Sequence, residues 1–237
     1  MGSIRQSEDY HIVIPKFYTD QECNSICELI SEHSDDLIRE HSPDSSVWAD
    51  SNGYTGLTAL HSTFNWIPLI EDNLGINLVQ RIMEQIDTRD VNDVFIKSWC
   101  NLWDKGEGIQ PHRHAAMDME QIGQYEWVTI QEHKHAEDDC RQHMISGNVF
   151  LSDNDHREYG TYYQGKGWVE NIRGDLHLFS PLIVHSVDSN TRQEPRMSQA
   201  FDIHLDGHFT NTSLESKEVY NHVEGLRNFL HIEVSRD

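Results

Sequence analysis

The sequence has no apolar run long enough to span a membrane, and its start, MGSIRQSEDY, lacks the apolar core of a signal peptide. It has only four cysteines among 237 residues. Cys23 and Cys27 are four residues apart on a predicted helix, which is not a zinc-ribbon spacing, so we expect reduced thiols. These absences predict a cytoplasmic protein that has no membrane partner.

Positive charge is also scarce. Lys and Arg total 18 against 40 Asp and Glu, which gives a formal net charge of −22. Such an acidic balance argues against a broad binding surface for nucleic acid or anionic lipid. We therefore expect no bulk nucleic-acid partner. The oligomeric state is not indicated by the sequence.

The length fits one domain, residues 1–237, and no internal repeat or low-complexity tract divides it. Residues 10–90 predict a short strand followed by helical support for a later core. Thr19 and Glu22 have the spacing of a capping box, which opens the first helix. The predicted helices span about residues 19–34, 73–85 and 213–230.

From about residue 92 to 205 the pattern changes to short strands separated by turns. Residues 93–103 alternate as a strand, and Trp99, Asn101 and Trp103 fall on one of its faces. Short strands preceded by helices predict a mainly β fold, an antiparallel sandwich with helices packed outside one sheet. Further strands are predicted at residues 146–151, 160–163, 167–172, 175–179, 184–187 and 196–205.

His112 and His114 directly follow the Trp-rich strand and a glycine turn. In extended backbone, residues i and i+2 point to the same side, so both imidazoles can converge on one atom. His185 lies in a predicted strand far downstream. A mononuclear Fe(II) oxygenase needs three protein ligands on one face of the metal. Arg196, eleven residues after His185, has a planar guanidinium that suits the carboxylate of a bound oxo-acid.

In order and spacing these segments resemble the 2-oxoglutarate/Fe(II)-dependent oxygenase superfamily. The resemblance covers about residues 11–205 and is nearest to a group found in marine bacteria and their phages. The helix opening Tyr18–Cys23 also resembles prolyl-hydroxylase-like members. The segments that carry the resemblance are 99–114 (WCNLWDKGEGIQPHRH), 145–151 (ISGNVFL), 173–187 (RGDLHLFSPLIVHSV) and 196–198 (RMS).

The resemblance implies a double-stranded β-helix, a cupin-like jelly roll, with Fe(II) bound by His112 and His185. It implies that O2 and 2-oxoglutarate are consumed together, and that oxidative decarboxylation is coupled to oxidation of the substrate, favouring hydroxylation. Arg196 would anchor the 2-oxoglutarate carboxylate. Ser198, two residues on and facing the same way, would help to hold it, and Asn101 is assigned to the same co-substrate site.

The sequence departs from this superfamily at His114, where its members have Asp or Glu. Three interpretations are open. His114 is the second ligand of a three-histidine triad, or it is the leading ligand and Ala116 stands at the carboxylate position, as in the halogenases of this superfamily. In the third, Asp118 or Glu120 from the following segment supplies the carboxylate. An imidazole in place of a carboxylate leaves the iron one charge more positive.

Residues 115–144 form a long excursion where the superfamily has only a few residues. The segment is polar, and a lid over the site is its simplest interpretation. It contains a second His-x-His, His133 and His135, which is a rival metal site. His177 and His204 alternate inside predicted strands, so we expect them to be buried core histidines.

Three other functions remain open at this stage. One is a three-histidine cupin-type dioxygenase that uses no 2-oxoglutarate, and the second is a halogenase-like variant that lacks the carboxylate ligand. The third is a non-catalytic jelly-roll binding module, because jelly rolls host many functions.

Overall fold

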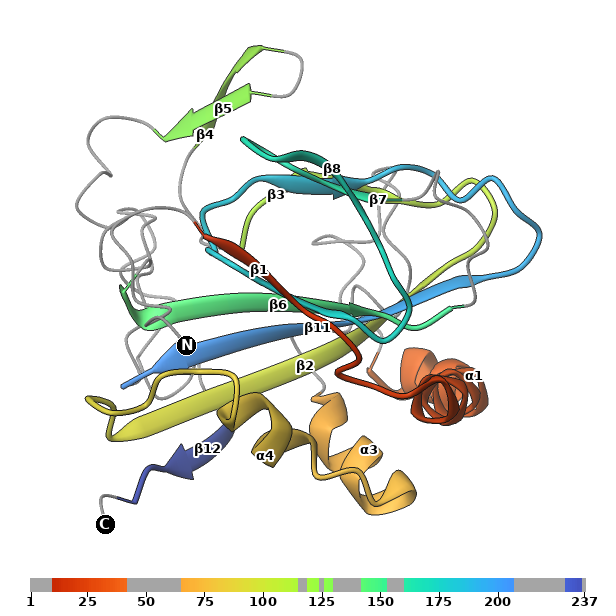
Figure 1. Ribbon diagram of the computed structural model, residues 1–237. Helices are drawn as coiled ribbons and strands as arrows, with labels where there is room; N and C mark the ends of the chain where they lie inside the picture. The colour runs from red at the N-terminus through yellow and green to blue at the C-terminus, as the bar shows by residue number, and fades with distance from the viewer. Residues whose placement is uncertain are drawn as a thin grey trace.

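The computed structural model describes residues 10–41, 65–114, 119–123, 126–129, 142–152, 160–206 and 229–235. Two antiparallel sheets face each other, and helices cover the outer side of the larger sheet (Figure 1). This confirms the mainly β fold of the jelly-roll type. The larger sheet has the order β1-β9-β6-β11-β2-β12, the smaller has the order β3-β10-β7-β8, and β4 and β5 form a two-stranded sheet.

The bounds of the elements follow the chain order. The helices are α1 (Asp20–His41), α3 (Trp66–Leu74) and α4 (Leu78–Met83). The strands are β1 (His11–Ile14), β2 (Asp93–Trp103), β3 (Ile109–His112), β4 (Met119–Gly123), β5 (Glu126–Thr129), β6 (Met144–Phe150), β7 (Gly160–Tyr163), β8 (Gly167–Glu170), β9 (Leu176–Phe179), β10 (His185–Val187), β11 (Arg196–Leu205) and β12 (Leu230–Glu233).

Strands β2 and β11 form the longest ladder and give the larger sheet two different faces. Val94 and Ile96 point toward the helices and belong to the main hydrophobic core. Trp99, Asn101 and Trp103 point the other way, into a pocket between the sheets. Because both faces of the sheet are covered, β2 is buried along nearly its whole length. A polar side chain of β2 such as Asn101 therefore faces the pocket rather than solvent.

The main core lies between the larger sheet and the helices. Ile26 and Ile30 of α1 and Trp66 and Ile70 of α3 are fully buried there. The predicted capping box at the start of α1 is confirmed, since the Glu22 carboxylate accepts the Thr19 N–H at 2.8 Å and the Thr19 hydroxyl accepts the Glu22 N–H at 3.2 Å. Within the described part of the chain, no helix has the length and apolarity needed to cross a membrane.

The second predicted helix, residues 73–85, is confirmed only in part, where α4 lies within it. The chain there forms α3 and α4, separated at Gly75, which caps α3 with a left-handed φ of +64°. Glycine adopts this conformation without steric cost, so it ends the helix where the apolar spacing alone continues. The first helix runs to residue 41 rather than 34.

Several strands were not predicted from the sequence. These are β3, β12 and the β4–β5 hairpin, which lies inside the expected excursion of residues 115–144. The predicted C-terminal helix, residues 213–230, falls almost entirely outside the described residues, and Leu230 begins β12.

Gly174 joins the start of α1 to the barrel, and its replacement by alanine is expected to destabilise the protein. It has a φ of +79°, and a Cβ added to it would lie 2.4 Å from the Tyr18 carbonyl oxygen. The Tyr18 N–H donates to the Gly174 carbonyl at 3.0 Å, so the two backbone segments cannot move apart without breaking this hydrogen bond. Gly174→Ala should lower the free energy of unfolding by about 2–4 kcal/mol in urea titrations.

Gly165→Ala is the matched control. Its φ is +81°, but an added Cβ would meet nothing within 4 Å. This variant should cost only the left-handed backbone strain, about 1 kcal/mol. Equal losses in both variants would contradict the role assigned to the close approach of Gly174 and Tyr18.

Candidate metal centre

Three imidazoles meet between the two sheets. One ligand nitrogen from each of His112, His114 and His185 lies within 4.8 Å of the other two. The ring centroids are 4.3 Å apart for His112 and His185 and 5.0 Å apart for His114 and His185. The structure therefore brings together all three histidines that the sequence proposed as metal ligands.

Strand pairing explains how distant parts of the chain supply these histidines. His112 ends β3 and lies directly opposite His185 in β10. His114 lies two residues beyond β3, where its backbone N–H donates to the Pro181 carbonyl at 3.1 Å. The chain therefore stays tied to the segment before β10, and His112 and His114 can turn to the same side.

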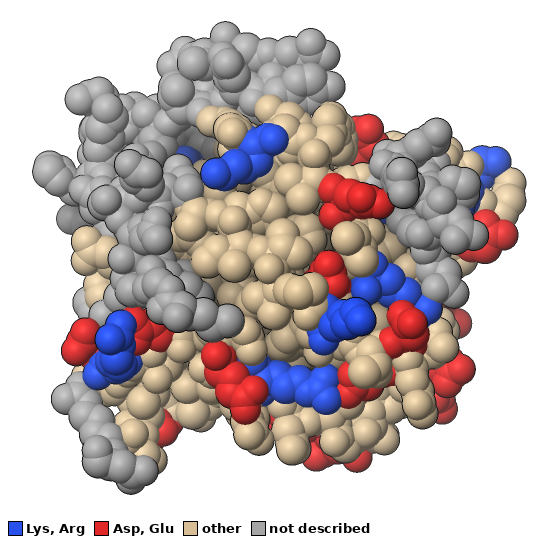
Figure 2. Space-filling model, viewed as in Figure 1, with Lys and Arg blue, Asp and Glu red and all other residues tan. Residues whose placement is uncertain are grey.

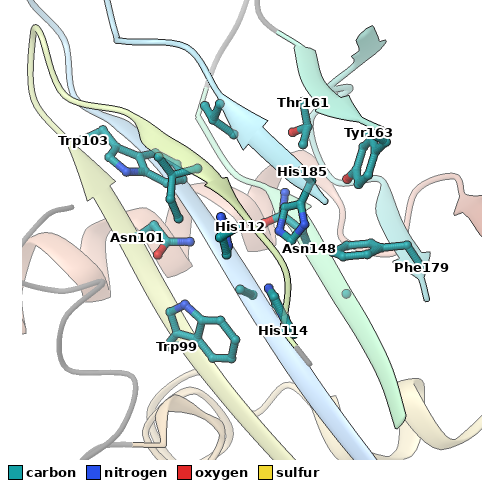
Figure 3. Close-up of a pocket in the computed structure, with 14 residues that line it drawn as sticks. Trp99, Asn101, Trp103, His112, His114, Asn148, Thr161, Tyr163, Phe179 and His185 are labelled. Atoms are coloured by element: carbon teal, nitrogen blue, oxygen red, sulfur yellow. The ribbon is translucent and has the colours of Figure 1, made fainter. Parts of the chain in front are cut away.

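The histidines lie in the middle of a mostly aromatic and aliphatic pocket. Figure 3 shows Trp99, Asn101 and Trp103 on one side of them and Tyr163 and Phe179 on the other. The His185 ring meets Phe179 edge-on, with centroids 4.8 Å apart. Such walls limit contact with water and strengthen electrostatic interactions at the centre.

His185 is held in its neutral form. Burial lowers its pKa well below the usual value, and the neighbouring His112 and His114 lower it further. Its Nδ1 lies 3.1 Å from the Ile183 carbonyl oxygen, which accepts the ring N–H and leaves Nε2 for a ligand. A neutral imidazole with one nitrogen bound to a carbonyl is the form in which histidine ligates a metal.

The donor set fits Fe(II). Imidazole nitrogen suits iron among other transition metals, and three ligands from one side leave open coordination positions. No further group of histidine, cysteine and carboxylate donors that could hold a metal is found in the described part of the chain.

The residues proposed to bind the co-substrate lie together on the inner face of β2 and β11. Asn101 pairs with Ser198 in the ladder, and its Nδ2 donates to the Ser198 hydroxyl at 3.1 Å. Arg196 pairs with Trp103 and is buried, with its guanidinium carbon 5.4 Å from the centre of the Trp103 ring. Asn101 lines the pocket itself, while Ser198 and Arg196 contact residues that line it.

Trp103 offers a hydrogen-bond donor to the same site. Its side chain is buried and lines the pocket, and no described atom accepts its indole Nε1–H. A buried donor without an acceptor costs free energy, which a carboxylate oxygen in the pocket would recover. Together with Arg196, this N–H fits the binding of an anionic co-substrate.

The other interpretations of the third ligand concern residues whose side chains the structure does not describe. Ala116 and Asp118 lie outside the described residues, and so do His133 and His135. Glu120 lies on β4, where only its backbone pairing with Val128 is described. These interpretations remain predictions, as does a lid formed by residues 115–144.

Sequence reasoning missed Asp202. Its Oδ1 lies 2.6 Å from Nδ1 of His114, and its side chain is only 17% exposed. A signal was present, because residues 196, 198, 200 and 202 share one face of β11 by strand alternation. Other pocket residues that were not predicted are Asn148, Thr161, Tyr163 and Phe179.

The predicted core histidines are confirmed as buried. His204 meets Phe229 edge-on, with ring centroids 5.1 Å apart. His177 shares a hydrogen bond of 3.2 Å with His11 and lies 3.5 Å from the Tyr163 hydroxyl.

His177 makes the protein sensitive to mild acid. Burial, and then the nearby His11, lower its pKa to about 4. In the unfolded chain this histidine takes up a proton near pH 6.5, whereas in the folded protein it stays neutral down to about pH 4. The free energy of unfolding therefore decreases by about 3 kcal/mol as the pH falls from about 6.5 to 4. Urea titrations at pH 7 and 4.5 should show a smaller loss for His177→Gln than for the wild type. Equal losses would contradict this role, since every other group is common to both proteins.

Comparisons with known proteins support the fold. No protein-family model and no curated protein matches the sequence. Among solved structures, HygX from Streptomyces hygroscopicus with nickel and 2-oxoglutarate bound superimposes with a TM-score of 0.50 at 13% identity, covering 82% of each chain. A Pseudomonas putida prolyl-4-hydroxylase gives 0.49 at 11% identity, covering 84% of this chain and 94% of its own. A viral collagen prolyl hydroxylase from Paramecium Bursaria Chlorella virus-1 gives 0.45 at 10%, covering 82% and 95%.

The likeness to HygX thus supports the fold that the motifs indicate. The likeness to HygX spans most of both chains, although few residues are identical. At this level of identity the likeness concerns architecture, so the chemistry has to be argued from the residues of the pocket.

Proposed function

We propose that the protein is a non-haem Fe(II) oxygenase that couples oxidative decarboxylation of 2-oxoglutarate to oxidation of a small molecule or peptide side chain, with hydroxylation as the favoured outcome. One observation carries the proposal: three imidazoles converge within 4.8 Å in a pocket lined by Trp103, whose indole N–H has no acceptor among the described atoms and whose ring packs against buried Arg196. This arrangement supports the binding of a metal and an anionic co-substrate in the same pocket.

His112, His114 and His185 would hold the iron. When bound, Fe(II) with 2-oxoglutarate activates O2 for the oxidation, and the protein supplies binding and orientation. Arg196 would attract the carboxylate of 2-oxoglutarate that lies away from the metal, with Trp103 and the Asn101–Ser198 pair as further hydrogen-bonding groups. The pocket walls formed by Trp99 and Phe179 would keep bulk water from the reacting atoms.

The experiment is co-substrate turnover without a known substrate. Protein reconstituted with Fe(II) under argon is mixed with 2-oxoglutarate, and the visible spectrum is recorded before and after exposure to air. We expect a weak charge-transfer band only when both Fe(II) and 2-oxoglutarate are present, followed by slow succinate formation in air. Tight iron binding with neither band nor succinate would overturn the 2-oxoglutarate part.

The same experiment separates the remaining candidates. The all-histidine group is also compatible with a cupin-type dioxygenase, which would bind iron and form no succinate. A halogenase-like enzyme would form succinate and show a spectrum that depends on chloride. A non-catalytic binding module would show neither turnover nor a co-substrate band.

The pocket and the surface charge both support a small substrate over a nucleic acid. The site is a pocket between the two sheets that is lined mostly by apolar side chains, which suits a small molecule or a single side chain. On the face in Figure 2, most described Lys and Arg side chains lie next to Asp or Glu rather than in one basic area. Such a surface does not favour bulk nucleic acid, in agreement with the net charge of −22.

A further inference from the structure

The side chain of His114 contacts Asp202, an aspartate that belongs to none of the predicted motifs. We propose that Asp202 is a positioning residue, which orients His114 for the metal and supplies, one hydrogen bond away, the negative charge that a carboxylate ligand would bring. The proposal rests on the proposed function, because it takes His114 as a metal ligand. Its basis is the distance of 2.6 Å between Asp202 Oδ1 and His114 Nδ1.

The hydrogen bond determines which ring nitrogen of His114 is available. An ionised carboxylate only accepts, so the His114 Nδ1–H donates and Nε2 carries the free electron pair. His185 has the same arrangement, with its Nδ1 bonded to the Ile183 carbonyl. Both rings therefore present Nε2 to the centre. Nδ1 of His185 donates to a neutral carbonyl, and Nδ1 of His114 donates to a charged carboxylate.

Asp202 is held in place by its own neighbours. The Ser146 hydroxyl donates to the same Oδ1 at 3.2 Å, and β6 and β11 pair these two residues directly. Lys97 lies opposite Asp202 in β2, is buried, and is attracted to its charge. The carboxylate is thus hydrogen-bonded from β6 and attracted to a positive charge on β2, and both interactions favour its position against His114.

The charge of this residue has a consequence for the metal. Three neutral imidazoles contribute no charge, whereas the His-x-Asp or His-x-Glu pattern of the superfamily contributes one negative charge. A carboxylate hydrogen-bonded to a ligating imidazole raises the basicity of that ligand, and the loss of such a partner typically weakens metal binding about 10–100-fold. In this chain the carboxylate of Asp202 lies behind His114 instead of binding the metal itself.

Metal affinity tests the proposal without any turnover. Co(II) is titrated into metal-free protein and followed by its visible absorption. Asp202→Asn, which keeps the shape but removes the charge, should bind Co(II) about 10–100-fold more weakly. The Fe(III)/Fe(II) midpoint potential should also become more positive, because one negative charge near the metal is lost. Asp175→Asn makes the same change at a buried aspartate that does not line the pocket, where Oδ1 accepts the Lys16 N–H, and it is the matched control, with an expected change below about threefold.

A double-mutant cycle separates positioning from general structural damage. In a His114→Asp background the ligand itself is a carboxylate, so Asp202→Asn should no longer weaken Co(II) binding. Equal weakening in both backgrounds, or no weakening in the wild-type background, overturns the proposal. Thermal melting of the metal-free variants checks that they are folded.

A measurement on the unmodified protein covers the case in which Asp202→Asn does not fold. Long-range 1H–15N spectra of the Zn(II)-loaded wild type should assign Nε2 of His114 as the metal-bound nitrogen and Nδ1 as protonated. Binding through Nδ1 overturns the proposal. Absence of any Co(II) or Zn(II) binding by the wild type would instead refute the metal site of the proposed function, so the two failures can be told apart.

Discussion

His185→Ala is expected to remove metal binding and, with it, all 2-oxoglutarate turnover. The side chain is buried between the two sheets, and Nε2 is the ring nitrogen that its bond to the Ile183 carbonyl leaves free for the metal. Loss of a residue that only hydrogen-bonds a ligand costs about 10–100-fold in metal affinity, so loss of a ligand should cost more than about 100-fold. Co(II) titration and succinate formation measure the two effects.

His177→Gln is the control for this change. His177 is also buried, and it lies in the neighbouring larger sheet without belonging to the three-histidine group. Its variant should bind Co(II) within about threefold of the wild type. Retention of tight Co(II) binding by His185→Ala would show that the metal is held elsewhere.

Arg196→Met is expected to weaken 2-oxoglutarate binding while leaving the metal in place. Hydrogen bonds to charged groups contribute about 1.5–3 kcal/mol, which corresponds to roughly 10–150-fold in affinity. Methionine retains an unbranched apolar chain against Trp103 and Phe150, so the packing of the guanidinium between these rings is partly replaced. The dependence of the charge-transfer band on 2-oxoglutarate concentration measures the loss.

Two further variants sharpen this prediction. Arg196→Lys keeps the charge but loses the planar fork, and it should fall between the wild type and Arg196→Met. Trp103→Phe replaces the indole by a smaller ring without an N–H and should weaken 2-oxoglutarate binding by at least the roughly 3–10-fold expected for one hydrogen bond. Unchanged 2-oxoglutarate affinity in Arg196→Met, with normal Co(II) binding, would place the anchor on another residue.

Local patterns were sufficient for much of the fold. Strands β7 and β11 begin and end at the predicted residues, because their alternation and flanking turn residues are properties of the segment itself. The capping box at Thr19 and Glu22 is equally local. The split between α3 and α4 was missed because apolar spacing continues across Gly75, where only the backbone conformation ends the helix.

Some residues of the candidate site could be predicted from local geometry, whereas others depended on strand pairing. His112 and His114 share a side because extended backbone repeats every two residues, which follows from covalent geometry. Their meeting with His185 depends on the pairing of β3 with β10, and only the resemblance to a known superfamily suggested it in advance. The position of Asp202 behind His114 followed from no motif and needed the register of the larger sheet against the His112–His114 segment.

The sequence by itself therefore determined the segments, their alternation, and the residue types capable of binding iron and an oxo-acid. The tertiary structure decided which of those residues meet, because pairing between strands far apart in the chain depends on register and on how two sheets face each other. It is this register that brings the three histidines together and sets the partly buried carboxylate of Asp202 behind His114, the one histidine that departs from the superfamily pattern.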